Sequence, residues 1–270
     1  MVAVAPLKSQ EALAKLEQGL TDLLASGDWQ KYLKFQSSFH HYSFNNSLLI
    51  MIQCPIATRV MGYQQWLSFG RQVRKGEKAI SILAPLKQKI EKEDGSDPSY
   101  RLAGFKIANV FDISQTEGEP LPTIASLLVG DDRGLVNKLA DFTRWMNISL
   151  QFEKLSSANG YCRFNADGTI VIVVDSRLSP RQTAKTLTHE LAHALMHDYT
   201  TYSQHNGLSV CELEAESVAH VVLDRFGLDT SEYSYGYICS WAKKEAIAIL
   251  KSSGAKIQQA AQRIIDWIER

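Results

Sequence analysis

The sequence predicts an α+β protein of two domains, because helical and strand patterns occur in separate blocks and do not alternate along the chain. The first half begins with helical periodicity and ends in two strands. The second half runs from a helix through a small sheet to further amphipathic helices. Residues 117–123 carry two prolines, which resist regular structure. We therefore predict domains over residues 1–118 and 127–270, joined by a linker over residues 119–126.

The first domain is expected to be rich in helices. Apolar spacing predicts helices near residues 13–27, 29–39, 48–53 and 64–69, and strands over residues 78–83 and 102–111. Pro55 and Gly70 end the third and fourth of these helices. A polar loop over residues 91–99, with an Asp-Gly turn, separates the two strands.

The second domain combines helices with a small sheet. Helices are predicted near residues 135–146, 179–197, 211–226, 240–250 and 257–268, and strands near 150–152, 161–164 and 169–174. The last two strands flank Asn-Ala-Asp-Gly at residues 165–168, which predicts a hairpin. Residues 169–174 are almost wholly apolar, so this strand is expected to be covered on both faces.

Composition favours a cytoplasmic protein without a membrane segment. The 270 residues have a net charge of zero and are 45% hydrophobic, enough for two ordinary cores. The N-terminus lacks the pattern of a signal peptide, and the longest apolar cluster of the first half, residues 48–52, is too short to cross a bilayer. Four scattered cysteines predict neither a zinc finger nor a disulfide framework.

The helix over residues 179–197 carries the strongest chemical signal. It begins with Ser179 as N-cap and Pro180 at the first helical position. His189 and His193 are four residues apart, so both imidazoles lie on one face and can bind one metal ion. Glu190 lies on the flank between them. This His-Glu-x-x-His pattern is typical of metal-dependent hydrolases, and it predicts Glu190 as the catalytic base.

A catalytic Zn²⁺ needs a third protein ligand, which the helix over residues 211–226 supplies. Glu212 falls within its apolar stripe, where an ionised carboxylate is costly unless paired or bound to metal. Glu212 is therefore predicted as the third ligand, with Glu216 as the alternative or as a group supporting the ligands. Glu214 falls on the far edge. His197 is two turns beyond His189, too far to share the ion, and is expected to be structural.

A basic and aromatic stretch precedes the first strand. Arg71, Arg74, Lys75 and Lys78 follow Tyr63 and Trp66 closely. Basic groups that track phosphates and rings on which bases stack are the two ingredients of single-strand binding. The same composition is also typical of buried rings beneath a solvated rim.

Residues 42–85 resemble the N-terminal domain of the ArdC antirestriction family, through Tyr-Ser-Phe-Asn-Asn-Ser-Leu-Leu-Ile, Gly-Tyr-x-x-Trp and Gly-Arg-x-Val-Arg-Lys-Gly-Glu-Lys. Residues 110–116, Val-Phe-Asp-Ile-Ser-Gln-Thr, fit the same pattern. The resemblance implies a domain that binds single-stranded DNA. By position in the motif, the phosphate contacts would be Arg71, Arg74, Lys75 and Lys78, and the stacking platforms Tyr63 and Trp66; for Trp66 a scaffold role is slightly favoured over stacking.

Residues 125–230 resemble the zincin fold of the ImmA/IrrE metallopeptidases in their order of helix, small sheet, metal helix and ligand helix. In that family a glutamate at the start of a Glu-x-x-Ala-x-x-x-Ala-like segment completes the site, which corresponds to Glu212. The family usually has Asn where this chain has Glu216, so the division between the two carboxylates stays open.

Together these features predict a zinc metallopeptidase tethered to a single-stranded DNA-binding domain. Its expected partners are single-stranded DNA and a protein or peptide substrate, such as a transcriptional regulator, and its purpose would be antirestriction or cleavage of a DNA-bound regulator. The alternative is a DNA-protecting antirestriction protein whose metal site is structural or non-proteolytic. Glu190 favours the enzyme, because a structural site would not need it.

Overall fold

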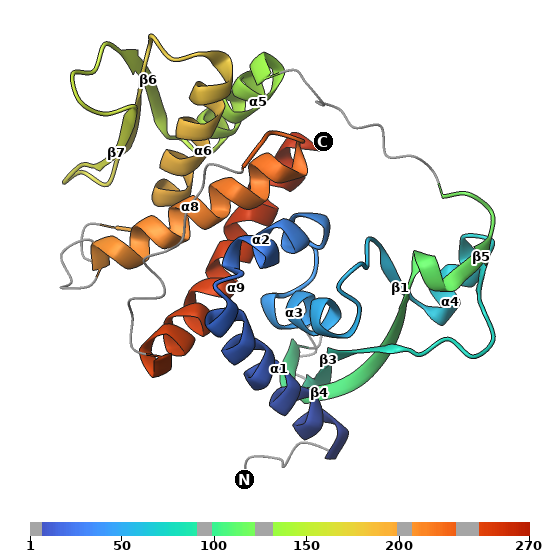
Figure 1. Cartoon of the computed structure of the whole chain (residues 1–270). Helices are drawn as coiled ribbons and strands as arrows, with labels where there is room; N and C mark the ends of the chain where they lie inside the picture. Colours follow the sequence, from blue (N-terminus) through green and yellow to red (C-terminus); the bar gives the residue numbers. More distant parts are fainter. Residues whose placement is uncertain (1–6, 91–98, 122–131, 199–206, 231–242) are drawn as a thin grey trace. The chain divides into compact units, whose positions relative to one another are not determined.

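The structure, a computed structural model, describes residues 7–90, 99–121, 132–198, 207–230 and 243–270 (Figure 1). The chain divides into two compact units. The first comprises residues 1–23 and 44–123, and the second comprises residues 24–43 and 124–270. The predicted first domain held all of residues 1–118, so the structure differs in assigning residues 24–43 to the second unit.

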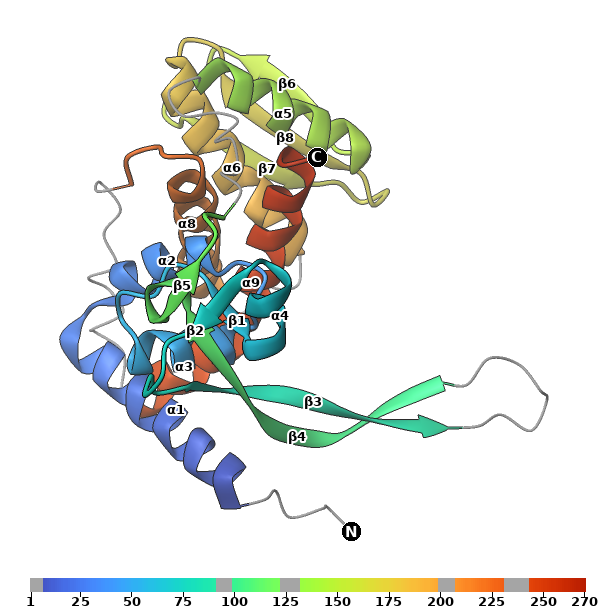
Figure 2. The ribbon, with the colours of Figure 1, turned by 90° about the vertical axis from the view of Figure 1, so that its right-hand side faces the viewer.

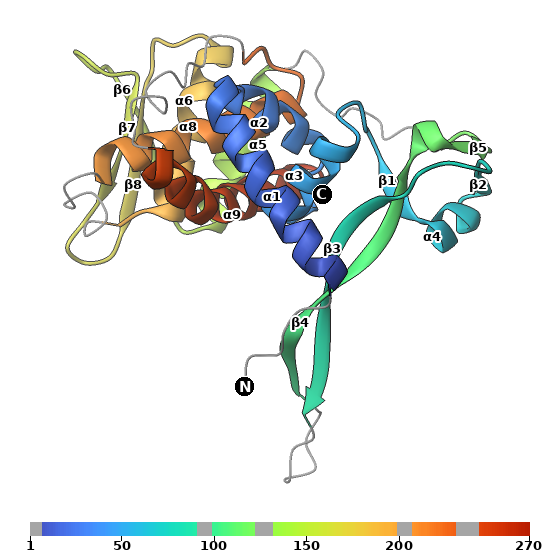
Figure 3. The ribbon, with the colours of Figure 1, turned by 60° about the horizontal axis from the view of Figure 1, so that its bottom comes forward.

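The first unit is built on a three-stranded antiparallel sheet. Its strands are β1 (Val60–Gly62), β4 (Ser99–Asp112) and β3 (Ile80–Ile90), in the order β1-β4-β3. Helices α1 (Leu7–Ser26), α3 (Phe44–Gln53) and α4 (Tyr63–Ser68) surround it, and β2 (Arg71–Val73) pairs with β5 (Thr116–Gly118). Strands β3 and β4 form a long twisted hairpin whose far half extends beyond the other elements of this unit (Figures 2 and 3).

Helix α3 protects the free edge of β3 with two side-chain amides. Asn46 donates to the carbonyl of Leu83 and accepts from its N–H, both at 2.9 Å. Gln53 makes the same pair of bonds to the backbone of Ser81, at 2.9 and 3.0 Å. An edge strand presents unpaired backbone groups. Here the two amides satisfy the outer backbone groups of Leu83 and Ser81, so α3 takes the place that a further strand would occupy beside β3.

Asp112 closes the turn after β4. Its carboxylate accepts from the backbone N–H groups of Thr58 and Arg59 at 2.8 and 3.0 Å, and from that of Ser114 at 2.9 Å. Gln115 completes a capping box on the short 3₁₀ helix η1 (Ile113–Gln115). Burial alone would raise the pKa of Asp112, but these hydrogen bonds outweigh it and hold the pKa below its ordinary value.

The second unit packs helices against a small sheet. Strand β8 (Ile170–Asp175) lies between β6 (Ser149–Glu153), which runs parallel to it, and β7 (Gly160–Phe164), which runs antiparallel. Residues 171–174 are buried, which confirms the prediction of a strand covered on both faces. The helices are α2 (Trp29–Ser38), α5 (Asp132–Trp145), α6 (Pro180–Met196), α8 (Gly207–Arg225) and α9 (Lys243–Ile268).

Residues 24–43 join the second unit because α2 packs on α8. Trp29 is 3% exposed and its indole N–H donates to Ser217 at 3.0 Å. Ser37 donates to Asp224 at 2.6 Å. Tyr32 and Leu33 are fully buried. The apolar face of α2 therefore finds its partner almost two hundred residues further along the chain, a pairing that periodicity cannot reveal.

The prediction of two C-terminal helices was wrong: α9 is continuous over 26 residues. Residues 252–254, Ser-Ser-Gly, lie within it. Glycine in a helix interior costs only about 1 kcal/mol, and packing overrides that cost. Ser253 is fully buried here.

Replacing Asp112 by Ala is expected to destabilise the first unit by about 1–3 kcal/mol, because three backbone N–H groups lose their acceptor. The folded pKa lies below the ordinary 3.8. The contribution should therefore be complete above that pH and be lost as the pH falls through the folded pKa. Thermal unfolding across pH measures both effects. Glu117→Ala, which removes an exposed carboxylate from the same unit, should leave the midpoint unchanged. An equal loss in both variants would contradict the assignment.

Candidate metal centre

Helix α6 presents the two histidines of the His-Glu-x-x-His pattern. Ser179 caps it, accepting from the N–H of Gln182 at 3.3 Å, and Pro180 begins it, as predicted. Leu187 and Leu191 are fully buried on the side that packs into the core. This anchoring fixes the helix rotation, so His189 and His193 face the first turns of α8.

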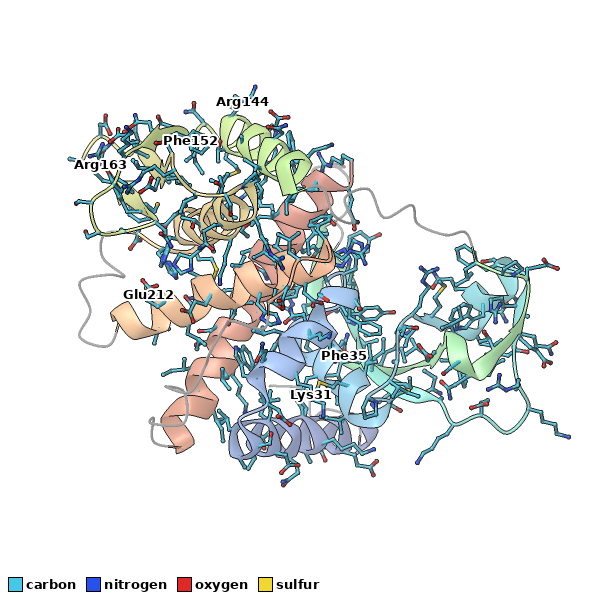
Figure 4. The ribbon with its side chains drawn as sticks, turned by 45° about the horizontal axis from the view of Figure 1, so that its top comes forward. Lys31, Phe35, Arg144, Phe152, Arg163 and Glu212 are labelled. Carbon is cyan, nitrogen blue, oxygen red and sulfur yellow. The ribbon has the colours of Figure 1, made fainter. Side chains whose placement is uncertain are left out.

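Three side chains converge at this point. The Nε2 atoms of His189 and His193 are 3.0 Å apart, and the Glu212 carboxylate lies 3.3 Å from the first and 3.6 Å from the second. Figure 4 shows Glu212 near the N-terminal end of α8. One donor atom from each residue lies within 4.8 Å of the other two. Two imidazole nitrogens and a carboxylate oxygen fit the donor set of a zinc-type site with one open position.

Charge and hydrogen bonding couple the three residues. The imidazoles of His189 and His193 beside it hold the pKa of Glu212 well below its usual range. Burial would lower the pKa of His189, but the hydrogen bond to Glu212 and the nearby carboxylates outweigh it and raise that pKa. Burial lowers the pKa of His193. His193 is thus favoured in the neutral form in which an imidazole binds metal.

A buried chain of side chains orients His193. Its Nδ1 lies 3.0 Å from Nδ1 of His197, whose Nε2 lies 2.8 Å from Glu214. Ser253 on α9 donates to the other oxygen of Glu214 at 2.5 Å. Because the carboxylate accepts from His197 Nε2–H, His197 Nδ1 can accept from His193 Nδ1–H. That tautomer leaves the lone pair of His193 on Nε2, which faces Glu212.

His197, predicted to be structural, and Glu214, for which no role was predicted, both belong to the contacts that orient His193. His197 is too far along the helix to share the ion, as predicted, but it contacts a predicted ligand directly. Glu214, which the helical wheel placed on the far edge, is 2% exposed. The signal that would have identified the pair is the spacing of four residues between His193 and His197. Glu216 raises the pKa of His189 through its charge, and its supporting role stays a prediction.

Glu190 lies beside the histidines in a nearly closed environment. It is 7% exposed, and burial, together with the charge of Glu212, raises its pKa to about 7. The backbone of Cys162, on β7, hydrogen-bonds to it. A Cβ on Gly160 would lie 2.6 Å from Thr186 and 2.9 Å from the carbonyl of Val173. Strand β7 therefore passes against α6 at a distance that only glycine permits.

The predicted stacking role of Trp66 needs correction. Its exposed fraction is 0%, and its indole N–H donates to the carbonyl of Phe111 at 2.9 Å. A ring with no exposed face cannot receive a base, so Trp66 is scaffold. Tyr63, at 42% exposed, remains a candidate.

The four predicted phosphate contacts divide into two pairs. Arg71 directs its guanidinium at Thr116, Gly118 and Glu119 on and after β5, with distances between 2.5 and 3.2 Å. Arg74 bonds Glu77 at 2.8 Å and the carbonyl of Ser114 at 2.5 Å. The arginines therefore hold the small β2–β5 sheet. Lys75 and Lys78 are exposed and stay the better candidates for phosphate.

Two family models match the chain, one in each half. Residues 9–117 match the family model of the N-terminal domain of anti-restriction factor ArdC, and residues 145–264 match that of the IrrE N-terminal-like domain, peptidase M78. An uncharacterized protein of Bacillus anthracis is 25% identical over 305 aligned residues, covering 97% of this chain and 52% of that protein. The chain thus spans about half the length of the curated relative it matches.

Two solved structures share the fold. The antirestriction protein ArdC of plasmid R388 in its Mn(II)-bound form has a TM-score of 0.60 and 21% identity, covering 94% of this chain and 97% of that one. Its metal-free form has a TM-score of 0.53 and 19% identity, covering 84% and 85%. These similarities confirm the α+β fold and both resemblances seen in the sequence. Of the helices in the described ranges, none is long and apolar enough to span a membrane.

Glu214→Gln is expected to weaken metal binding between α6 and α8 by about 10–100-fold, because the neutral amide no longer fixes the His197–His193 tautomer. Equilibrium dialysis against Zn²⁺ or Mn²⁺ measures the affinity. The matched control is Glu216→Gln, which removes a carboxylate two residues from Glu214 on the same helix. Equal losses of metal affinity in both variants would mean that negative charge on α8 matters and that the hydrogen bonds from His193 through His197 to Glu214 do not.

Proposed function

We propose, from the combination of an ArdC-type N-terminal domain with an IrrE-like domain of the peptidase M78 type in one chain, a metal-dependent peptidase coupled to single-stranded DNA binding. The observation that carries the peptidase is the position of Glu190. A structural metal site needs ligands and nothing more. This site also holds a buried carboxylate beside the ligand pair, with its pKa raised to about 7, close to the value that suits a general base.

His189, His193 and Glu212 would hold a divalent metal. The similar ArdC structure was obtained with Mn(II). Two imidazoles and one carboxylate are also the ligands of zinc hydrolases, and we propose Zn²⁺ as the ion used here. When bound, the metal would supply a Lewis acid that polarises the scissile carbonyl and acidifies the attacking water.

Glu190 would carry the proton. Its carboxylate accepts a proton from the water as the water oxygen attacks the peptide carbonyl carbon, and it returns that proton to the amine nitrogen as the C–N bond breaks. Burial of Glu190 suits both the uptake and the return of the proton, because it raises the pKa of this carboxyl above that of a free carboxylate and leaves it below that of an amine. The backbone of Cys162 steadies the carboxylate in its ionised state.

Strand β7 offers a place for an extended substrate. It pairs with β8 on one side, and within the described sheet its other side has no strand neighbour. Free backbone groups on such an edge bind a peptide by adding it as a further strand. Because β7 also contacts Glu190 through Cys162, a peptide added there would lie beside the metal centre.

Glu190→Gln is expected to keep the metal and lose peptide hydrolysis by at least about a hundredfold, because general base catalysis typically contributes 10²–10⁴-fold. The assay incubates metal-loaded protein with host lysate, with and without single-stranded DNA, and sequences new N-termini. Termini that appear with the parent protein and not with the variant identify the substrate. Identical products from both would remove Glu190 from the mechanism.

The first unit would bind single-stranded DNA through exposed lysines and through the β3–β4 hairpin. Tyr100, Leu102 and Phe105 are 63%, 56% and 44% exposed. The strand register places Phe105 opposite Pro85 and Leu102 opposite Lys87, so the Phe105 ring and the Leu102 side chain share a face with a lysine. Exposed rings beside basic groups suit stacked bases and phosphates. The hairpin thus provides the stacking surface that Trp66 cannot.

Lys75→Ala with Lys78→Ala is expected to lower affinity for single-stranded DNA and to flatten its dependence on salt, because fewer counterions are released. Tyr100→Ala should cost about 1–3 kcal/mol of binding through lost stacking. Neither change should move the thermal midpoint, since all three side chains are exposed. Fluorescence anisotropy at several salt concentrations measures both effects.

Two controls accompany this test. Lys154→Ala removes an exposed lysine from the second unit and should leave DNA binding unchanged. Arg71→Ala should lower stability, because the guanidinium holds β5. Full affinity in the triple variant of Lys75, Lys78 and Tyr100 would overturn the proposed surface.

Antirestriction is the second candidate function. The two similar solved structures described above are of an antirestriction protein, and residues 9–117 match the domain named for that factor. Protection of incoming DNA by binding alone would require the first unit and not Glu190. The Glu190→Gln variant therefore separates the two functions: retained protection with lost hydrolysis would favour binding.

A further inference from the structure

A second group of possible metal ligands lies within the second unit, away from the α6–α8 centre. His40 and His41 follow α2, Asp266 lies in the last turn of α9, and Glu269 directly follows that helix. One donor atom each from His40, His41 and Asp266 lies within 4.8 Å of the other two. This group shares no residue with the α6–α8 centre, so the inference is independent of the proposed peptidase.

His40 leaves a buried nitrogen unsatisfied. The residue is 3% exposed. Its Nδ1 lies 3.2 Å from the carbonyl of Ser37, so Nδ1 carries the hydrogen and Nε2 carries a lone pair. Among the residues that the structure describes, Nε2 has no hydrogen-bond partner. The nearest charged atom is a Glu269 oxygen at 4.0 Å, beyond hydrogen-bonding distance.

The groups around this nitrogen are also acceptors. Asp266 lies 3.7 Å from Nδ1 of His41, and that nitrogen faces the amide N–H of Gln262 at 3.4 Å. Arg225 is the cation at hand, but its donors go to the other oxygen of Glu269, at 2.8 and 2.6 Å. Two imidazole nitrogens and two carboxylate oxygens therefore approach one another, and few N–H donors are available to bond them.

No donor among the described residues reaches Nε2 of His40, so its lone pair stays free. A neutral buried imidazole with a free lone pair is the form that binds a metal.

We propose that His40, His41 and Asp266, with Glu269 within reach, form a second site for a divalent metal of the zinc class. Imidazole with carboxylate suits Zn²⁺ and its neighbours in the transition series better than Mg²⁺ or Ca²⁺. Four protein donors would close the coordination shell, which is the mark of a structural site. Bound there, the ion would fasten the turn after α2 to α9.

The test counts Zn²⁺ bound to the untagged full-length chain by equilibrium dialysis, in four proteins. The parent should bind about two ions per chain, and His193→Ala should retain about one. His41→Ala combined with Asp266→Asn should also retain about one, and all three changes together should retain none. His41 and Asp266 are chosen because both are partly exposed, so the variants should fold.

Two further measurements keep the outcome decisive. Zn²⁺ should raise the thermal midpoint of His193→Ala, and this rise should vanish when His41 and Asp266 are also replaced. Asp141→Asn, an exposed carboxylate on α5, should leave the count unchanged. A His193→Ala chain that binds no zinc overturns the second site, whatever becomes of the peptidase. The second site is also overturned if His41→Ala with Asp266→Asn binds as many ions as the parent and only His193→Ala binds one fewer.

Discussion

The second unit depends on one buried carboxylate, that of Glu214. It lies on α8, is met by His197 from just beyond α6 and by Ser253 from α9, and has Lys256 at 3.9 Å. A buried charge is tolerated only when it is paired and hydrogen-bonded. Glu214 therefore requires the three helices to meet at one point, and His193, whose ring continues the same chain of contacts, takes its orientation from that meeting.

The first unit uses polar side chains in a similar way. Asn46, Gln53 and Asp112 all satisfy backbone groups at the margins of the sheet. Arg71 and Arg74 do the same for β5 and η1. Several residues of the stretches that resemble ArdC are thus scaffold. A motif shared with a family contains residues that hold the fold as well as residues that contact a ligand, and solvent exposure distinguishes the two.

The sequence predicted helix α6 well and its surroundings less well. Helical periodicity placed His189, Glu190 and His193 correctly on α6, and the cost of a charge on an apolar stripe pointed to Glu212, which the structure places beside both histidines. The same wheel misjudged Glu214, because the far edge of α8 is covered by α9, a contact that no local pattern contains. The buried Trp66 and the continuous α9 have the same cause. Tertiary packing decided them, and local propensity is too weak to oppose it.

The assignment of residues 24–43 to the second unit makes the chain path discontinuous. The polypeptide enters that unit with α2, leaves it for most of the first unit, and returns after residue 123. During synthesis, α2 leaves the ribosome long before the α8 surface that buries Trp29 and Tyr32 exists. Its apolar face must wait, exposed or held by a chaperone, until the C-terminal part is made. A protease that cut the connection near residue 120 would likewise leave α2 seated on α8, so the two pieces would stay together.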